Sequence, residues 1–199
     1  QQSAAATVHA KALIELSDFK SRLGPRTARP RVPGRIEIRE TRYMRLSIWP
    51  TAQQPWEDIL EVVTYADDAG WYSAYVWDHF MGDGAGFGAE TVPTLESTAL
   101  LAALGALTTS IRLGSMVLGN THRHPAVVAN WAATVDLITG GRFTLGLGAG
   151  WQTNEHRMYG IDLPPAGERR RRLDESCAVI RTLLINDRST FDGEFYQLD

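Results

Sequence analysis

An adjacent carboxylate and imidazole, Asp78 and His79, are the residues of this sequence best placed for proton chemistry. They follow a short run at 73–77 whose aromatic and β-branched residues predict a β-strand. Imidazole titrates near neutral pH, which suits a general acid or base. The two residues alone leave a second interpretation open, in which the aspartate caps a loop turn and the histidine is simply exposed.

A second group of candidates lies between positions 111 and 160. A predicted strand (111–118), a helix that begins at Pro125 and a second strand (142–147) form a βαβ unit, which joins parallel strands. Parallel sheets carry their binding sites at the carboxyl ends of the strands. We therefore expect the residues at these ends to meet on one rim: Asp78, His79, Met116, Val117, Gly148 and Trp151.

The glycines at 146–150 invite comparison with a dinucleotide-binding loop. Trp151 and Gln152 occupy the positions around the expected third glycine, so the G-x-G-x-x-G spacing fails. The better interpretation is a backbone that closely approaches a flat ring, with Trp151 as a wall.

Strand and helix patterns alternate from Arg45 onward. The predicted strands are 45–49, 73–77, 111–118 and 142–147, the helices 56–69, 94–108, 125–139 and 167–186, with a hairpin at 190–198. Four such units fit an open doubly wound sheet or half of an eight-stranded barrel. A complete (β/α)8 barrel needs about 250 residues, more than this region supplies.

The first 43 residues differ from the rest. Up to position 42 the chain carries nine Lys/Arg against four Asp/Glu, whereas the remainder carries eleven arginines against nineteen acids. A short helical pattern covers 10–19, and the Pro-, Gly- and Arg-rich stretch after it cannot bury enough apolar surface to fold alone. We predict a disordered basic extension or linker at 1–43 and one domain at 44–199.

Composition excludes several classes of protein. With 44% hydrophobic residues and a formal charge of −3, the chain is an ordinary globular sequence, so neither nucleic acid nor membrane is an expected partner. Its single cysteine, Cys177, fits a cytoplasmic location.

The spacing of His122 and His124 suits a metal, but too few ligands converge, so structural loop histidines are favoured and no metal site is predicted.

Five motifs in order resemble the luciferase-like monooxygenase superfamily, and within it the oxidoreductases that use the deazaflavin coenzyme F420. The motifs are Asp78-His79-Phe80, LGSMV at 113–117, His124-Pro125-Ala126, Gly140-Gly141-Arg142 and LGAGW at 147–151, with Glu155-His156 behind them. The resemblance covers 44–199. It implies an α/β fold of the TIM (β/α)8-barrel type, here about the first four units, truncated at the C-terminal side.

The resemblance also implies roles for individual residues. Asp78 would contact the cofactor, and His79 would act as acid/base beside the carbon that transfers hydride. Met116 and Val117 would form a bulge with a non-prolyl cis peptide against the middle ring of the deazaflavin. The remaining cofactor contacts would come from Asn120 at the polar edge and from Gly148, Ala149, Gly150 and Trp151.

The implied activity is hydride transfer between F420 and a small organic substrate, in a protein expected to be a homodimer when full length. The alternative within this fold is an FMN-dependent monooxygenase of the alkanesulfonate or luciferase type. A related sugar-phosphate dehydrogenase branch has Glu where this chain has Trp151, which argues against that substrate. An alternative of another class is a non-catalytic truncated remnant, whose unpaired outer strands would favour association.

Overall fold

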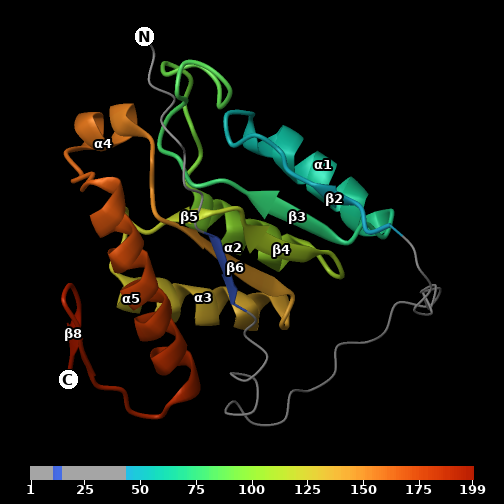
Figure 1. The fold of residues 1–199 in the computed structure, drawn as a ribbon. Helices are drawn as coiled ribbons and strands as arrows, with labels where there is room; N and C mark the ends of the chain where they lie inside the picture. The colour runs from blue at the N-terminus through green and yellow to red at the C-terminus, as the bar shows by residue number, and fades with distance from the viewer. Residues whose placement is uncertain (1–10, 15–43) are drawn as a thin grey trace.

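The computed structural model describes residues 11–14 and 44–199, and a parallel sheet lies at its centre. Its four consecutive parallel strands are β2 (Ser47–Ile48), β3 (Ser73–Val76), β4 (Arg112–Ser115) and β6 (Phe143–Gly148), side by side in the order of the sequence (Figure 1). Ala74 lies opposite Ile48 on one side and Leu113 on the other. The predicted parallel, sequential sheet is confirmed.

A helix follows each of these strands in the chain. In order they are α1 (Trp56–Asp68), α2 (Ser97–Leu107), α3 (Pro125–Thr139) and α5 (Ala166–Ile185), and consecutive helices of this series contact one another. Sequential parallel strands with right-handed crossovers place their helices on one side of the sheet. This is the arrangement of the first four units of a (β/α)8 barrel. None of the helices in the described residues is both long and apolar enough to cross a bilayer.

Local chemistry sets the helix ends. His124 caps α3, because its Nδ1 accepts a hydrogen bond from the N–H of Ala126 (3.2 Å). The predicted start of the second helix at 94 is three residues early. α2 begins at Ser97 because the Glu96 side chain accepts the N–H of Ala99 (2.7 Å). A further short helix, α4 (Thr153–Tyr159), follows β6 and is absent from the sequence prediction.

The predicted continuous strand at 111–118 is wrong. β4 ends at Ser115, the Met116–Val117 peptide bond is cis, and the chain resumes as β5 (Leu118–Gly119). β5 pairs with the end of β6, at Leu147 and Gly148. The cis bond lies where the family resemblance implies one.

The N-terminal region also requires a correction. Residues Lys11–Ile14 form β1, which runs antiparallel to β6 with Lys11 opposite Gly148. The helical pattern predicted at 10–19 is therefore wrong for these four residues, and the outer edge of β6 is paired. The extension or linker at 1–43 stays a prediction. A run this short fits a strand as well as a helical turn, and a sheet edge offers it free backbone partners. The rest of 1–43 lies outside the described residues.

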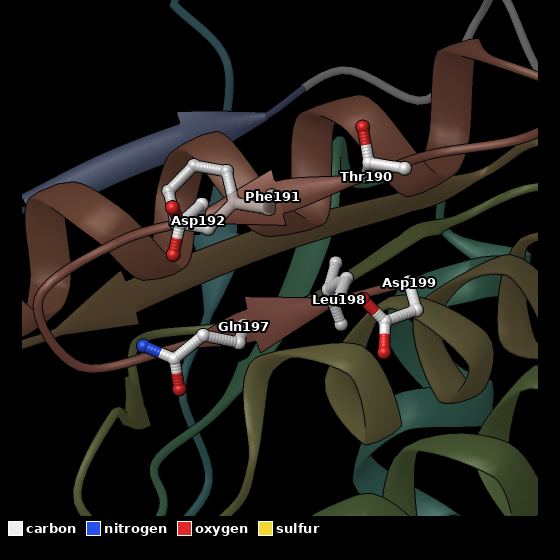
Figure 2. A pocket seen from close by; sticks show the side chains of 6 residues that line it. All are labelled: Thr190, Phe191, Asp192, Gln197, Leu198 and Asp199. Carbon is white, nitrogen blue, oxygen red and sulfur yellow. The ribbon is translucent and has the colours of Figure 1, made fainter.

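The predicted C-terminal hairpin is present. β7 (Phe191–Asp192) pairs antiparallel with β8 (Gln197–Leu198), and the N–H of Gly193 donates to the carbonyl of Tyr196 (2.9 Å). Glu175 of α5 accepts backbone N–H groups of this turn, so the hairpin is tied to that helix. A surface hollow is lined by six residues of this segment: Thr190, Phe191, Asp192, Gln197, Leu198 and Asp199 (Figure 2).

Asp67, near the end of α1, orders the loop that enters β4. Its carboxylate accepts the N–H groups of Thr109 (2.6 Å), Ser110 (2.8 Å) and Ile111 (2.6 Å), together with the hydroxyls of Thr109 and Ser110. Burial alone would raise the pKa of Asp67, but these hydrogen bonds lower it below its usual value. One side chain therefore satisfies three consecutive backbone N–H groups of this loop.

Replacing Asp67 with Asn should destabilise the fold, because an amide NH2 would then face N–H donors. We expect the free energy of unfolding at pH 7, measured by urea denaturation, to fall by about 2–3 kcal/mol. The pKa of the carboxyl is lowered from 3.8, so its stabilisation is present above that pH and is lost on acidification. The matched control is Asp68→Asn at the exposed neighbouring position, with a change of less than about 0.5 kcal/mol. Equal losses in the two variants would contradict this account.

Candidate active site

The ends of the central strands meet on one rim of the sheet. The carbonyl of Val76, just before the loop with Asp78 and His79, accepts the N–H of Met116 (2.8 Å). The N–H of Asn120 donates to the carbonyl of Gly148 (2.8 Å). The structure thus brings all the predicted site residues to this rim: Asp78, His79, Met116, Val117, Asn120, Gly148, Ala149, Gly150 and Trp151.

Asp78 is buried, with 3% of its surface exposed, and both carboxylate oxygens accept hydrogen bonds. Arg123 binds both oxygens (2.7 and 3.0 Å), and the N–H of Gly119 (2.8 Å) and the Ser97 hydroxyl also donate. Burial would raise the pKa of Asp78, but His122 and Arg123 hold it well below its usual range. Asp78 is therefore an ionised anchor of three loops, and its contact with a cofactor stays a prediction.

His79 is held by a second buried carboxylate, that of Glu155. His79 Nδ1 lies 2.9 Å from Glu155 Oε1, and Glu155 Oε2 accepts the N–H of Phe80 (2.8 Å). Burial would raise the pKa of Glu155, but its contacts with His122 and His79 lower it to about 2. An ionised Glu155 can only accept a hydrogen bond from Nδ1–H, so the imidazole Nε2 is left to face the site.

Aromatic rings surround His79. The ring centres of Trp77, Phe87 and Trp151 lie 5.4, 5.3 and 5.4 Å from that of the imidazole. Phe87 reaches this position on the glycine-rich loop after β3, where Asp83 accepts its N–H (2.9 Å). Among the described residues none forms a hydrogen bond with Nε2, so this nitrogen lies between apolar walls.

His122 lies between the two buried carboxylates. Its side chain is 2% exposed; Nδ1 is 3.2 Å from Asp78 Oδ2, and Nε2 is 3.6 Å from Glu155 Oε1. The first distance is a hydrogen bond and the second an ion pair. Burial opposes a charge on the ring, but the two carboxylates raise the pKa of His122 to about 9. The ring is therefore an imidazolium at neutral pH.

His156 connects the remaining loops of the rim. Its ring nitrogens contact the carbonyl of Gln152 (2.6 Å) and the Thr121 hydroxyl (2.8 Å). His122, Glu155 and His156 lie close enough together to bind one ion, yet hydrogen bonds and ion pairs within the protein explain their grouping. His124, the other histidine considered for a metal, serves instead as the cap of α3.

The glycines of the rim pack against the protein itself. A Cβ on Gly148 would lie 2.6 Å from Val117 Cγ2, and one on Gly146 would lie 2.3 Å from the carbonyl oxygen of Ser115. Gly150 has a φ of +81°, and a Cβ there would meet the Thr121 hydroxyl at 2.6 Å. These contacts explain why glycine is required at each position, whereas close approach to a flat ligand stays a prediction.

Sequence reasoning assigned no role to four residues of this site: Phe87, His122, Arg123 and Glu155. Each lies on a loop or first helical turn at the carboxyl end of a strand, which is the available signal. His122 was interpreted as a loop histidine, because nothing in the spacing reveals that Asp78 and Glu155 meet on either side of it. That meeting depends on contacts of His122 with residues 44 positions before it and 33 positions after it.

The profile of one protein family, described as luciferase-like monooxygenase, matches residues 43–199. The chain belongs to the luciferase-like monooxygenase family. An F420-dependent glucose-6-phosphate dehydrogenase of Mycolicibacterium smegmatis is 37% identical over 147 residues, covering 70% of this chain and 41% of that protein. A 4-hydroxyprotoasukamycin monooxygenase of Streptomyces nodosus subsp. asukaensis is 39% identical over 132 residues, covering 66% of this chain and 33% of that protein.

Solved structures of the luciferase-like family have the same fold as this chain. An F420-dependent secondary alcohol dehydrogenase in complex with an F420-acetone adduct superposes with a TM-score of 0.66 at 26% identity. The match covers 78% of this chain and 47% of that one. The chain therefore spans less than half the length of the luciferase-like relatives it matches, as a partial barrel does.

The charge on His122 should make the stability of the fold depend on alkaline pH. Its pKa rises from 6.5 to about 9 on folding, so its stabilisation is complete below pH 6.5 and is lost as the pH rises through 9. Relative to His122→Phe, the wild-type chain should lose about 3 kcal/mol of unfolding free energy across this window. Urea denaturation at stepped pH measures the difference.

The matched control for this experiment is His124→Phe, at the exposed cap of α3. Asp78, Glu155 and His156 are the titratable groups that face His122, and all three are retained in both variants. The control should follow the wild-type pH dependence. A wild-type curve parallel to that of His122→Phe between pH 6.5 and 9 would contradict the charge assignment.

Proposed function

We propose that this chain forms the first half of an F420-dependent oxidoreductase in which His79 moves a proton to or from a small organic substrate. One observation carries the proposal: the His79 imidazole is locked by Glu155 through Nδ1 and presents Nε2 between aromatic rings at the rim. The names of the F420-dependent relatives support the choice of cofactor.

The exposure of the rim residues supports a binding place for a flat tricyclic ring. Met116 and Val117 are half-buried directly after β4, and Trp151 is 41% exposed. We infer that these residues and the backbone of Gly148, Ala149 and Gly150 hold the ring. Asn120, which is 7% exposed, would bond its polar edge. When bound, F420 supplies or accepts the hydride.

His79 would manage the proton that accompanies hydride transfer. For oxidation of an alcohol, Nε2 would accept the hydroxyl proton, and for reduction of a carbonyl it would return one. Glu155 stabilises the imidazolium formed in the first case, because the carboxylate stays ionised 2.9 Å from Nδ1. The aromatic rings exclude water from the transfer and favour an uncharged substrate group beside His79.

A second candidate function is that of a flavin-dependent monooxygenase. The likeness to a 4-hydroxyprotoasukamycin monooxygenase favours it, since that protein is 39% identical over its matched residues. A monooxygenase of this kind would need FMN and oxygen. The two candidates are therefore separated by the cofactor that the full-length protein binds.

Titration of the full-length protein with F420 and with FMN, followed by fluorescence, tests the proposal. We expect micromolar or tighter binding of F420 and binding of FMN that is at least tenfold weaker. Preference for FMN would favour the monooxygenase instead. Failure to bind either cofactor would contradict both candidate functions.

Replacing His79 with Ala in the full-length protein should lower turnover much more than cofactor affinity. General acid–base catalysis contributes typically 10²–10⁴-fold, so we expect kcat to fall by at least about 100-fold while the dissociation constant of F420 changes less than about threefold. His124→Ala, outside the rim, is the control variant. Equal losses of turnover and affinity in His79→Ala would make His79 a binding residue.

A further inference from the structure

A line of alternating charges runs through the rim and ends at His79. In order it contains Arg123, Asp78, His122, Glu155 and the imidazole of His79, with the closest polar atoms of neighbouring side chains 2.7, 3.2, 3.6 and 2.9 Å apart. The five residues come from loops after β3, β5 and β6, including the first turn of α4. Each charged group of the line faces an opposite charge, and His122 Nε2 is the buried atom of the line without a hydrogen-bond partner, because Glu155 Oε1 lies 3.6 Å away.

His122 is the centre of this line and has no contact with bulk water. Its side chain is 2% exposed, and its ring lies on Phe80 (4.6 Å between centres) and beside His156 (5.1 Å). A neutral imidazole has one N–H and one lone pair, so it would turn a lone pair toward one of the two carboxylates. Only the doubly protonated ring places a proton on both nitrogens, so that Nδ1 donates to Asp78 and Nε2 lies in an ion pair with Glu155, which agrees with the pKa of about 9.

Glu155 transmits this charge to His79. As a carboxylate, its Oε1 can only accept, so His79 carries its proton on Nδ1 and keeps the lone pair of Nε2 free. As a carboxylic acid, Glu155 would donate to Nδ1 and favour the opposite tautomer, in which Nε2 is blocked by its own proton. The charge of Glu155 therefore decides which nitrogen of His79 faces the site.

We propose that His122 is a positioning residue: as a buried imidazolium between Asp78 and Glu155 it keeps Glu155 ionised, and Glu155 in turn holds His79 in the Nδ1–H tautomer. The catalytic value of this tautomer rests on the proposed function, in which Nε2 exchanges a proton with the substrate. The chain of contacts itself does not depend on any cofactor.

Nitrogen-15 NMR of the histidine-labelled 199-residue chain tests the proposal without cofactor or substrate. The chain contains five histidines, which single substitutions assign. At pH 7.5 we expect both ring nitrogens of His122 to carry protons. In its neutral form, His79 should show the Nδ1–H tautomer.

Two variants then test whether Glu155 and His122 control the tautomer of His79. Glu155→Gln offers His79 both an acceptor and a donor, so the ratio of Nδ1–H to Nε2–H tautomer should fall roughly tenfold or more. His122→Phe keeps a ring against Phe80 but removes the charge, and the ratio should fall there too. In the double variant the loss should equal that of Glu155→Gln alone, because His122 acts through Glu155. His124→Phe is the control and should leave the ratio unchanged.

Several results would overturn the proposal. A single protonated nitrogen on His122 at pH 7.5 would remove its charge, and this measurement on the wild-type chain stands even if a variant does not fold. An unchanged His79 tautomer in a folded His122→Phe or Glu155→Gln variant would break the chain of contacts. Failure of the full-length protein to bind F420 would refute the proposed function and leave these NMR results unaffected.

Discussion

The burial of two carboxylates, Asp78 and Glu155, is the constraint on which the rest of the rim depends. A buried carboxylate costs several kcal/mol unless cations and N–H donors surround it. The loop after β5 supplies the N–H of Gly119, the imidazolium of His122 and the guanidinium of Arg123. The loop after β3 contributes both Asp78 itself and the N–H of Phe80 that binds Glu155. These loops can therefore satisfy their charges only in one mutual arrangement.

The parallel sheet and the buried ionic contacts contribute to the site in different ways. Strand order and register bring the loops to one rim, and tight packing of Gly146 and Gly148 against the β4–β5 connection lets the strands approach. The ionic contacts then orient individual side chains, above all His79. The aromatic rings of Trp77, Phe87 and Trp151 enclose the imidazole from the remaining directions. The outcome is an imidazole held from several sides at the rim where (β/α)8 barrels carry their active sites.

Much of the fold follows from the sequence because its signals are local. The proline before α1, the glycine stop at Gly140 and the apolar runs of β3 and β6 each act within a few residues. The errors arise where distant partners decide the structure. β1 forms because the edge of β6 is available for pairing. The strand predicted at 111–118 is interrupted because its last part, β5, pairs with Leu147 and Gly148 of β6.

The residues of the candidate site also fall into those with a local sequence signal and those that depend on distant partners. Asp78 and His79 are visible in the sequence as an acid–base pair at a strand end, and the family resemblance points to the same residues. Glu155 and His122 are not visible as functional residues, since their importance lies in pairing with side chains 76 and 44 positions away. No local pattern specifies that a histidine in a loop will be surrounded by two carboxylates.

We propose that Nε2 of His79 faces the reacting part of an F420 molecule held on this rim. The most direct measurement is a crystal structure of the full-length protein with F420 bound. The account predicts the deazaflavin ring against Met116 and Val117, with the His79–Glu155 contact retained and Nε2 turned toward the face of the ring where a substrate binds. A ring bound away from this rim, or a His79 rotated away from Glu155 and from the ligand, would contradict it.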